Sequence, residues 1–131
     1  MSGPSPLDAV PFARTLGIEL ASAGAEEVRG SLGWSEELCT AAGVMHGGAL
    51  MALADTLGAL CAFLNLPPGA TTATLESKTN FFRPVTEGQV HAVSRPLHVG
   101  RTVIVVQTDL RGDDGKRVAQ VTQTQAVRGK A

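Results

Sequence analysis

Residues 47–64 form the one segment of the sequence that is long and periodic enough for a major helix. Leucines recur at helical spacing, as at Leu50, Leu53 and Leu57. Alanines and glycines occupy most of the other positions, so the helix is slim and can lie close against a sheet. Residues 65–69, Asn-Leu-Pro-Pro-Gly, end it, because proline cannot continue a helix and glycine permits the turn.

A possible reactive site begins where this helix begins. His46, Gly47 and Gly48 precede the apolar run, and Asp55 lies within it. A helix start offers unpaired N–H groups and a positive dipole end. A carboxylate buried among apolar residues is costly unless it has a function or a partner. Donors for an oxyanion together with a base or nucleophile indicate acyl-transfer chemistry. Asp55 could instead cap, pair or face solvent, but its neighbours on the helix offer no cation.

Strand patterns lie on both sides of the long helix. We expect a short helix over 11–16 and strands over 18–23, 27–34, 72–82, 89–98, 102–111 and 117–127. Short glycine-containing turns favour antiparallel neighbours. An antiparallel sheet that cradles the single long helix is the simplest way to bury it, which predicts an α+β fold. Residues 102–111 are apolar on both faces, so we expect a second copy of the sheet to cover the outer face.

The composition suits a single folded domain. Of the 131 residues, 44% are hydrophobic and 18% are charged. We expect the domain to cover residues 12–127, after a loose N-terminal leader over 1–11 and before a short polar tail over 128–131.

Several classes of function find no support in the sequence. A net charge of −1 and an aromatic content of 4% argue against nucleic-acid binding. No apolar run of about 18 residues predicts a membrane span. Residues 1–6 do not resemble a secretory signal, and Cys39 and Cys61 form no disulfide framework, so we expect a cytoplasmic protein. The three histidines are not spaced as metal ligands, and we expect no metal.

Helix geometry separates the two parts of the possible site. Gly47 and Asp55 are eight residues apart, which places them roughly 12 Å apart along the axis. A reacting carbonyl should lie about 3 Å from both its donor and its base. Two helices related by a two-fold axis can meet this requirement, with Gly47 of one chain facing Asp55 of the other. We therefore expect a dimer with two shared sites.

Taken together, these residues resemble the hotdog-fold acyl-CoA thioesterases, and most closely the branch named for phenylacetate degradation. The resemblance covers roughly residues 12–127. It rests on the helix start at 44–48 with Asp55, and on the segments 80–85, 96–102 and 114–120. It implies one long helix wrapped by a curved antiparallel sheet of five to six strands. It also implies hydrolysis of an acyl-CoA or aryl-CoA thioester, without a cofactor, by a homodimer or homotetramer.

The resemblance also implies roles for single residues. Asp55 matches the carboxylate that acts as general base or nucleophile, and the Gly47 N–H matches the donor that polarises the carbonyl. These two groups come from opposite subunits in the family. His46 matches a residue that supports the loop or contacts the carbonyl region. Thr74 matches a strand serine of some relatives and is our candidate for orienting water.

Two positions depart from the family pattern. Thr40 stands where relatives often carry Asn or Gln, close to the thioester. Ala59 stands where some relatives carry Ser or Thr, one turn after the carboxylate. Both departures lie around Asp55, so they concern the rate and the choice of substrate.

The remaining candidates concern substrate binding. We expect Gly48 and Thr40 to contact the substrate. The turn Gly100-Arg101-Thr102 can present N–H groups and a cation to CoA phosphates. Lys78, Arg83 and Arg95 are further candidate cations, although surface cations are usually only solvated. Two other functions stay open: a non-catalytic acyl-CoA binder on the same fold, and a hotdog hydratase or dehydratase.

Overall fold

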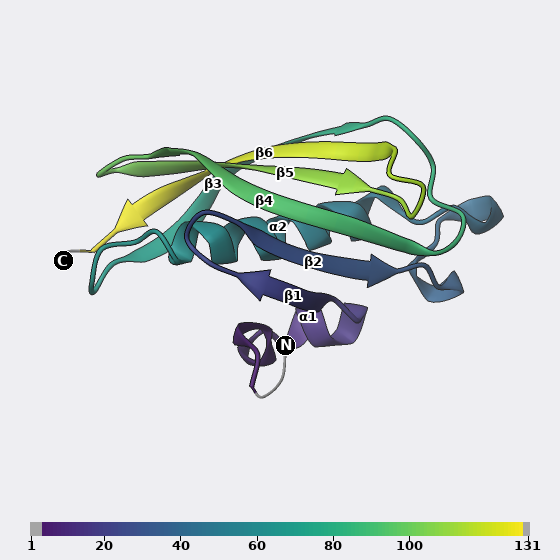
Figure 1. Ribbon diagram of the computed structural model, residues 1–131, viewed down its shortest axis with the longest axis horizontal. Coiled ribbons are helices and arrows are strands. Elements are labelled where there is room, and N and C mark those ends of the chain that lie inside the picture. Colours follow the sequence, from purple (N-terminus) through teal and green to yellow (C-terminus); the bar gives the residue numbers. More distant parts are fainter. Residues whose placement is uncertain (1–3, 130–131) are drawn as a thin grey trace.

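The structure, a computed structural model, describes residues 4–129 (Figure 1). Its helical elements are η1 (Pro6–Ala9), α1 (Pro11–Leu16), η2 (Glu36–Leu38), η3 (Ala41–Gly43) and α2 (Gly47–Phe63). Its strands are β1 (Glu19–Ala23), β2 (Val28–Gly33), β3 (Thr71–Phe81), β4 (Gln89–Val99), β5 (Val103–Arg111) and β6 (Arg117–Arg128). The predicted helices and strands are present, with ends that differ by no more than a few residues.

The six strands form one antiparallel sheet in the order β1-β2-β4-β5-β6-β3. The chain leaves β2, passes through α2, and places β3 at the far edge beside β6. In Figure 1, α2 lies along one face of the curved sheet, and it contacts every strand from β2 to β6. This arrangement confirms the predicted α+β hotdog fold with one long helix.

The core lies between α2 and the sheet. Leu53, Leu57 and Cys61 of α2 are fully buried against sheet residues such as Ile104. Burying a leucine of this kind contributes about 1.5–3 kcal/mol. Gly30 lets β2 approach the helix, because a Cβ there would lie only 2.9 Å from Leu57 Cδ1.

The N-terminal segment is more ordered than the sequence suggested. Residues 1–11 were expected to form a loose leader, but Pro6–Ala9 form a 3-10 helix. Ser5 and Asp8 form its capping box, and Leu7 is buried in the core. The sequence did not predict this capping pattern, because it lies in a short segment between prolines. Residues 1–3 of the expected leader and 130–131 of the expected tail lie outside the described residues, and Arg128 still belongs to β6.

The sheet edge at β3 is long and open. Most of its 11 residues are exposed, including Leu75 and Phe81. The pairing with β6 shifts between Thr74 and Glu76, so Leu75 is the extra residue of a β-bulge. An unprotected edge of this length can pair with another strand.

Candidate active site

The loop before α2 is held in place by backbone hydrogen bonds. The Thr40 N–H donates to the Val44 oxygen at 2.8 Å, and the His46 N–H donates to the Leu38 oxygen at 2.8 Å. The indole N–H of Trp34 donates to the Gly43 oxygen at 2.9 Å. These contacts fix the direction in which the chain enters the helix. Thr40 itself is exposed on this loop.

His46 is the N-cap of α2. Its Nδ1 accepts a hydrogen bond from the Gly48 N–H at 2.7 Å, so a neutral ring carries its proton on Nε2. The Gly48 N–H is therefore already engaged. The Gly47 N–H has no hydrogen-bond partner within residues 4–129. One donor at the helix start thus remains for a ligand, and the role expected for Gly47 stays a prediction.

Phe81, at the end of β3, packs over Gly47. A Cβ added to Gly47 would lie 3.0 Å from Phe81 Cζ, closer than ordinary contact. Phe81 is still 51% exposed. The aromatic ring and the free N–H therefore form one wall of the site, and glycine makes their close approach possible.

Asp55 does not lie where the sequence suggested. We expected a carboxylate enclosed by apolar residues, but in this single chain Asp55 is exposed. The reason is that its side of α2 faces the open β3 edge and not the core. The carboxylate does have a neutral partner, because Gln123 Nε2 donates to Asp55 Oδ1 at 3.3 Å.

The face of β3 that is turned toward α2 is rich in hydroxyl groups. Paired residues of antiparallel strands point to the same side of a sheet. The three pairs concerned are Thr74 with Gln125, Ser77 with Gln123, and Thr79 with Val121. Their β6 partners are all buried under the helix. Sequence reasoning identified Thr74 but missed Ser77 and Thr79, because the bulge at Leu75 changes which residues share that face.

The structure does not bring every predicted residue together. Gly100, Arg101 and Thr102 form the β4–β5 turn, beside Asn65 and Pro67 at the C-terminal end of α2. A groove of about 700 Å³ lies there. The helix start is 16 residues away, roughly 24 Å along the axis. Within one chain, Arg101 therefore cannot serve the same ligand atoms as Gly47.

A small pocket, which the sequence did not predict, lies beside the helix start. It has a volume of about 230 Å³ and lies between α1, η2 and the first turns of α2. Phe12, Leu16 and Leu38 supply apolar walls, and His46 lines its edge. The sequence signal was the pair of apolar residues in the short helix before β1, whose position against α2 could not be inferred.

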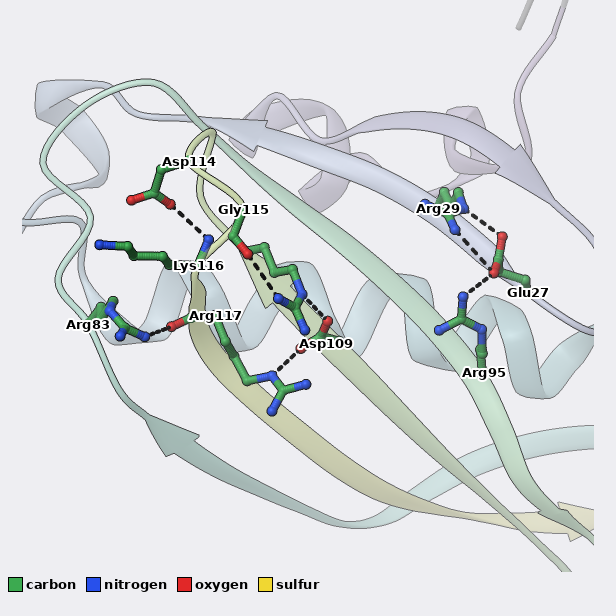
Figure 2. Close-up of polar contacts among 10 residues, drawn as sticks. Glu27, Arg29, Arg83, Arg95, Asp109, Asp114, Gly115, Lys116 and Arg117 are labelled. Carbon is green, nitrogen blue, oxygen red and sulfur yellow. Dashed lines mark hydrogen bonds and ion pairs between the residues drawn. The ribbon is translucent and has the colours of Figure 1, made fainter.

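Of the four candidate cations, Arg95 alone forms an ion pair within residues 4–129 (Figure 2). Arg95 and Arg29 both contact Glu27, and the hydrogen bond from Arg29 is the main cause of the lowered pKa of that carboxyl. Arg83 donates instead to the Arg117 carbonyl at 3.0 Å. Within residues 4–129, Arg83, Lys78 and Arg101 form no ion pair.

A second ion cluster joins β5 to β6. Burial alone would raise the pKa of Asp109, but hydrogen bonds from Arg111 and Arg117 outweigh it and lower that pKa. Figure 2 shows Asp109 beside the Arg117 side chain at the β5–β6 hairpin. The cluster lies away from Asp55 and stabilises the hairpin.

Comparison with known proteins identifies the family. The family model described as "Thioesterase superfamily" matches residues 42–119, which include both the helix start and Asp55. The chain belongs to the thioesterase superfamily. Its reaction class is therefore the hydrolysis of a thioester bond.

Individual relatives agree with this assignment. The chain is 31% identical to the proofreading thioesterase EntH of Cronobacter turicensis over 87% of this chain and 83% of that protein. A thioesterase of Haemophilus influenzae superimposes with a TM-score of 0.86 at 32% identity, covering 90% of this chain and 82% of that one. A phenylacetic acid degradation-related protein of Ralstonia eutropha gives a TM-score of 0.82 at 28% identity, covering 95% and 92%.

The helices within residues 4–129 include none that is both long and apolar enough to cross a membrane. In the same residues, no three His, Cys, Asp or Glu side chains cluster so that they could hold a metal ion.

Proposed function

We propose that this thioesterase hydrolyses acyl-CoA thioesters at a site shared by two chains. The observation that supports the proposal is that each chain presents two incomplete half-sites. Gly47 presents an N–H without a hydrogen-bond partner in residues 4–129, and Asp55 presents an exposed carboxylate. Each lacks what the other supplies, and one helix holds them roughly 12 Å apart.

The exposed surface around Asp55 supports a dimer. Met51, Asp55 and Phe63 follow one another at intervals of four and eight residues, so they share one side of α2, and all three are exposed. This side adjoins the open β3 edge. Pairing of two β3 edges about a two-fold axis covers the apolar residues and turns each Asp55 toward the partner's helix start.

The chemistry follows from these positions. The Gly47 N–H stabilises the oxyanion as the thioester carbonyl is attacked, and the CoA thiolate leaves. Asp55 either takes a proton from the attacking water, or attacks the carbonyl itself to form an acyl anhydride that water then hydrolyses. Thr74 orients the water. His46 supports the donor by its bond to Gly48, so its role is to shape the helix start.

The acyl group and the CoA part of the substrate bind at different places on the protein. The pocket between α1 and the start of α2 takes a small apolar or aryl acyl group, with Phe12 and Leu16 as walls. Arg83 and the Arg101 turn supply cations for the CoA phosphates. The outer face of β5, where Val103 and Val105 are half-buried, is the surface through which two dimers form a tetramer.

The direct test is release of free thiol from a panel of acyl-CoAs. Benzoyl-CoA, phenylacetyl-CoA, hexanoyl-CoA and palmitoyl-CoA cover aryl, short and long acyl groups. We expect turnover with at least one, and a loss of about 10² or more in kcat for Asp55→Asn. Binding of these thioesters without thiol release would contradict the proposal and favour a non-catalytic binder.

A further inference from the structure

Two glutamines are buried in the middle of β6. Gln123 and Gln125 are each only 1% exposed and point toward α2. Buried amides are unusual, because each needs hydrogen-bond partners that the interior must provide. A large apolar residue would fill the same space without that requirement, so each glutamine calls for an explanation.

Gln125 has partners for both ends of its amide. Thr72 Oγ1 donates to Gln125 Oε1 at 3.0 Å, and Gln125 Nε2 donates to Thr74 Oγ1 at 2.7 Å. Both threonines belong to β3. Gln125 therefore fastens the edge strand to β6 and fixes the Thr74 hydroxyl.

Only the nitrogen of the Gln123 amide has a hydrogen-bond partner within the described residues. Its Nε2 donates to Asp55 Oδ1 at 3.3 Å, while its Oε1 is buried and has no partner within residues 4–129. The opposite orientation of the amide would place its oxygen against the carboxylate, which is unfavourable when Asp55 is ionised. The one contact that accounts for a polar side chain at position 123 is therefore the contact to Asp55.

The helix is shaped to admit this glutamine. Gly58 lies three residues after Asp55 in α2, and a Cβ added there would lie 1.9 Å from Gln123 Oε1. Any side chain at position 58 would thus displace the amide. Because glycine weakens a helix interior relative to alanine, its presence here matches the space that Gln123 occupies.

We propose that Gln123 is a positioning residue, which holds the Asp55 carboxylate in its reactive orientation by donating to Oδ1 and leaving Oδ2 for water or the thioester. The inference rests on the proposed function, in which Asp55 is the reacting carboxylate. Gln123 acts from a buried strand and touches no substrate atom. Gln125, two residues further along the same face, holds Thr74 from the same rigid strand roughly 7 Å away.

The test compares Gln123→Met with a matched change elsewhere. Methionine has a similar volume and lacks the donor. We expect kcat with the best acyl-CoA of the panel to fall about 10- to 100-fold, with KM changed less than about twofold. The control is Thr108→Val on β5. This change removes the buried hydrogen bond between Thr108 Oγ1 and Ser94 Oγ, which are 2.6 Å apart. It should lower the melting temperature and leave kcat unchanged.

Gly58→Ala provides a second test that keeps the glutamine. Its Cβ should push the amide away from Asp55 and lower kcat to a similar extent, even though alanine favours the helix. This variant also covers the case in which Gln123→Met fails to fold. Unchanged kcat in a folded Gln123→Met or Gly58→Ala protein overturns the inference.

A double variant separates this inference from the proposed function. If Gln123 acts through Asp55, Gln123→Met has no further effect on kcat in an Asp55→Asn background. An equal loss in both backgrounds overturns the inference and leaves Asp55 in the mechanism. Full turnover in Asp55→Asn alone instead removes the proposed function, whatever Gln123→Met does.

Discussion

The imidazole of His46 accepts a hydrogen bond from the Gly48 N–H at 2.7 Å, and the N–H of the intervening Gly47 has no partner among residues 4–129. The groups of the first helical turn therefore have different roles, one structural and one chemical. His46 and Gly48 complete the cap, and Gly47 retains the donor.

We expect His46→Ala to weaken both the helix and the reaction. Loss of an N-cap destabilises a protein by about 0.5–2 kcal/mol. The Gly47 N–H should then be less well oriented, so kcat should also fall. His46→Asn, which is a good N-cap, should keep most of the stability. Urea unfolding and thiol release would check both effects, and equal stability of His46→Ala and the parent would show that the cap is unimportant.

Gly47→Pro tests the free N–H directly. Proline is tolerated at the first position of a helix, and the extended backbone of His46 (φ −62°, ψ 136°) suits a residue before proline. The change removes the N–H, and we expect kcat to fall about 10²- to 10³-fold. Gly47→Ala is the matched control, since it adds a similar contact to Phe81 and keeps the N–H. Similar losses in both variants would assign the effect to Phe81.

The ion cluster around Asp109 should make stability depend on pH. Its pKa is lowered in the folded protein, so its stabilisation is present above the unfolded value, near 3.9, and is lost as the pH falls toward the folded pKa. We expect Asp109→Asn to lose about 0.5–1 kcal/mol at pH 7, since both arginines are partly exposed.

The difference in stability between Asp109→Asn and the parent should shrink as the pH falls below the unfolded value, because the parent carboxylate then becomes protonated as well. Urea unfolding at several pH values measures it. Glu26→Gln, which removes an exposed carboxylate that forms no ion pair within residues 4–129, is the control and should show no such dependence. A constant difference between Asp109→Asn and the parent at every pH would contradict the assignment.

The two cysteines should differ in reactivity. Burial raises the pKa of the Cys61 thiol to about 11, whereas Cys39 is partly exposed. At pH 8 we expect a thiol reagent to modify Cys39 quickly and Cys61 only after unfolding. Cys39→Ser should abolish the fast phase. Rapid modification of Cys61 in the folded protein would mean that α2 is not packed as described.

The sequence predicted the long helix and the strands because their signals are local. Periodic leucines and the prolines after Asn65 mark the helix, and glycine turns mark the strand ends. The strand order was not predictable, because it depends on where β3 lies after the chain leaves α2. Gln123 was missed for the same reason, and Ser77 was missed because the bulge at Leu75 changes the register of β3. Polar residues on a strand look like solvent-facing positions until the register with a buried neighbour is known.

For the site, the sequence predicted roles for Asp55, Gly47 and His46, which lie in one short segment. It could not give the exposure of Asp55, because that depends on the open edge beside β3. Nor could it distinguish the N–H of Gly48, which donates to His46, from that of Gly47, which has no acceptor in the part of the chain that the structure describes. Those distinctions come from side-chain geometry and leave no pattern in a single chain's sequence.

Mixed dimers test most directly whether the site is shared between chains. Asp55→Asn and Gly47→Pro homodimers should each be nearly inactive. When they are unfolded and refolded together in equal amounts, about half of the dimers contain one chain of each kind, and each of these has one intact site. We expect thiol release to recover to about a quarter of the parent rate. No recovery, with mixed dimers verified by mass, would contradict a site built from two chains.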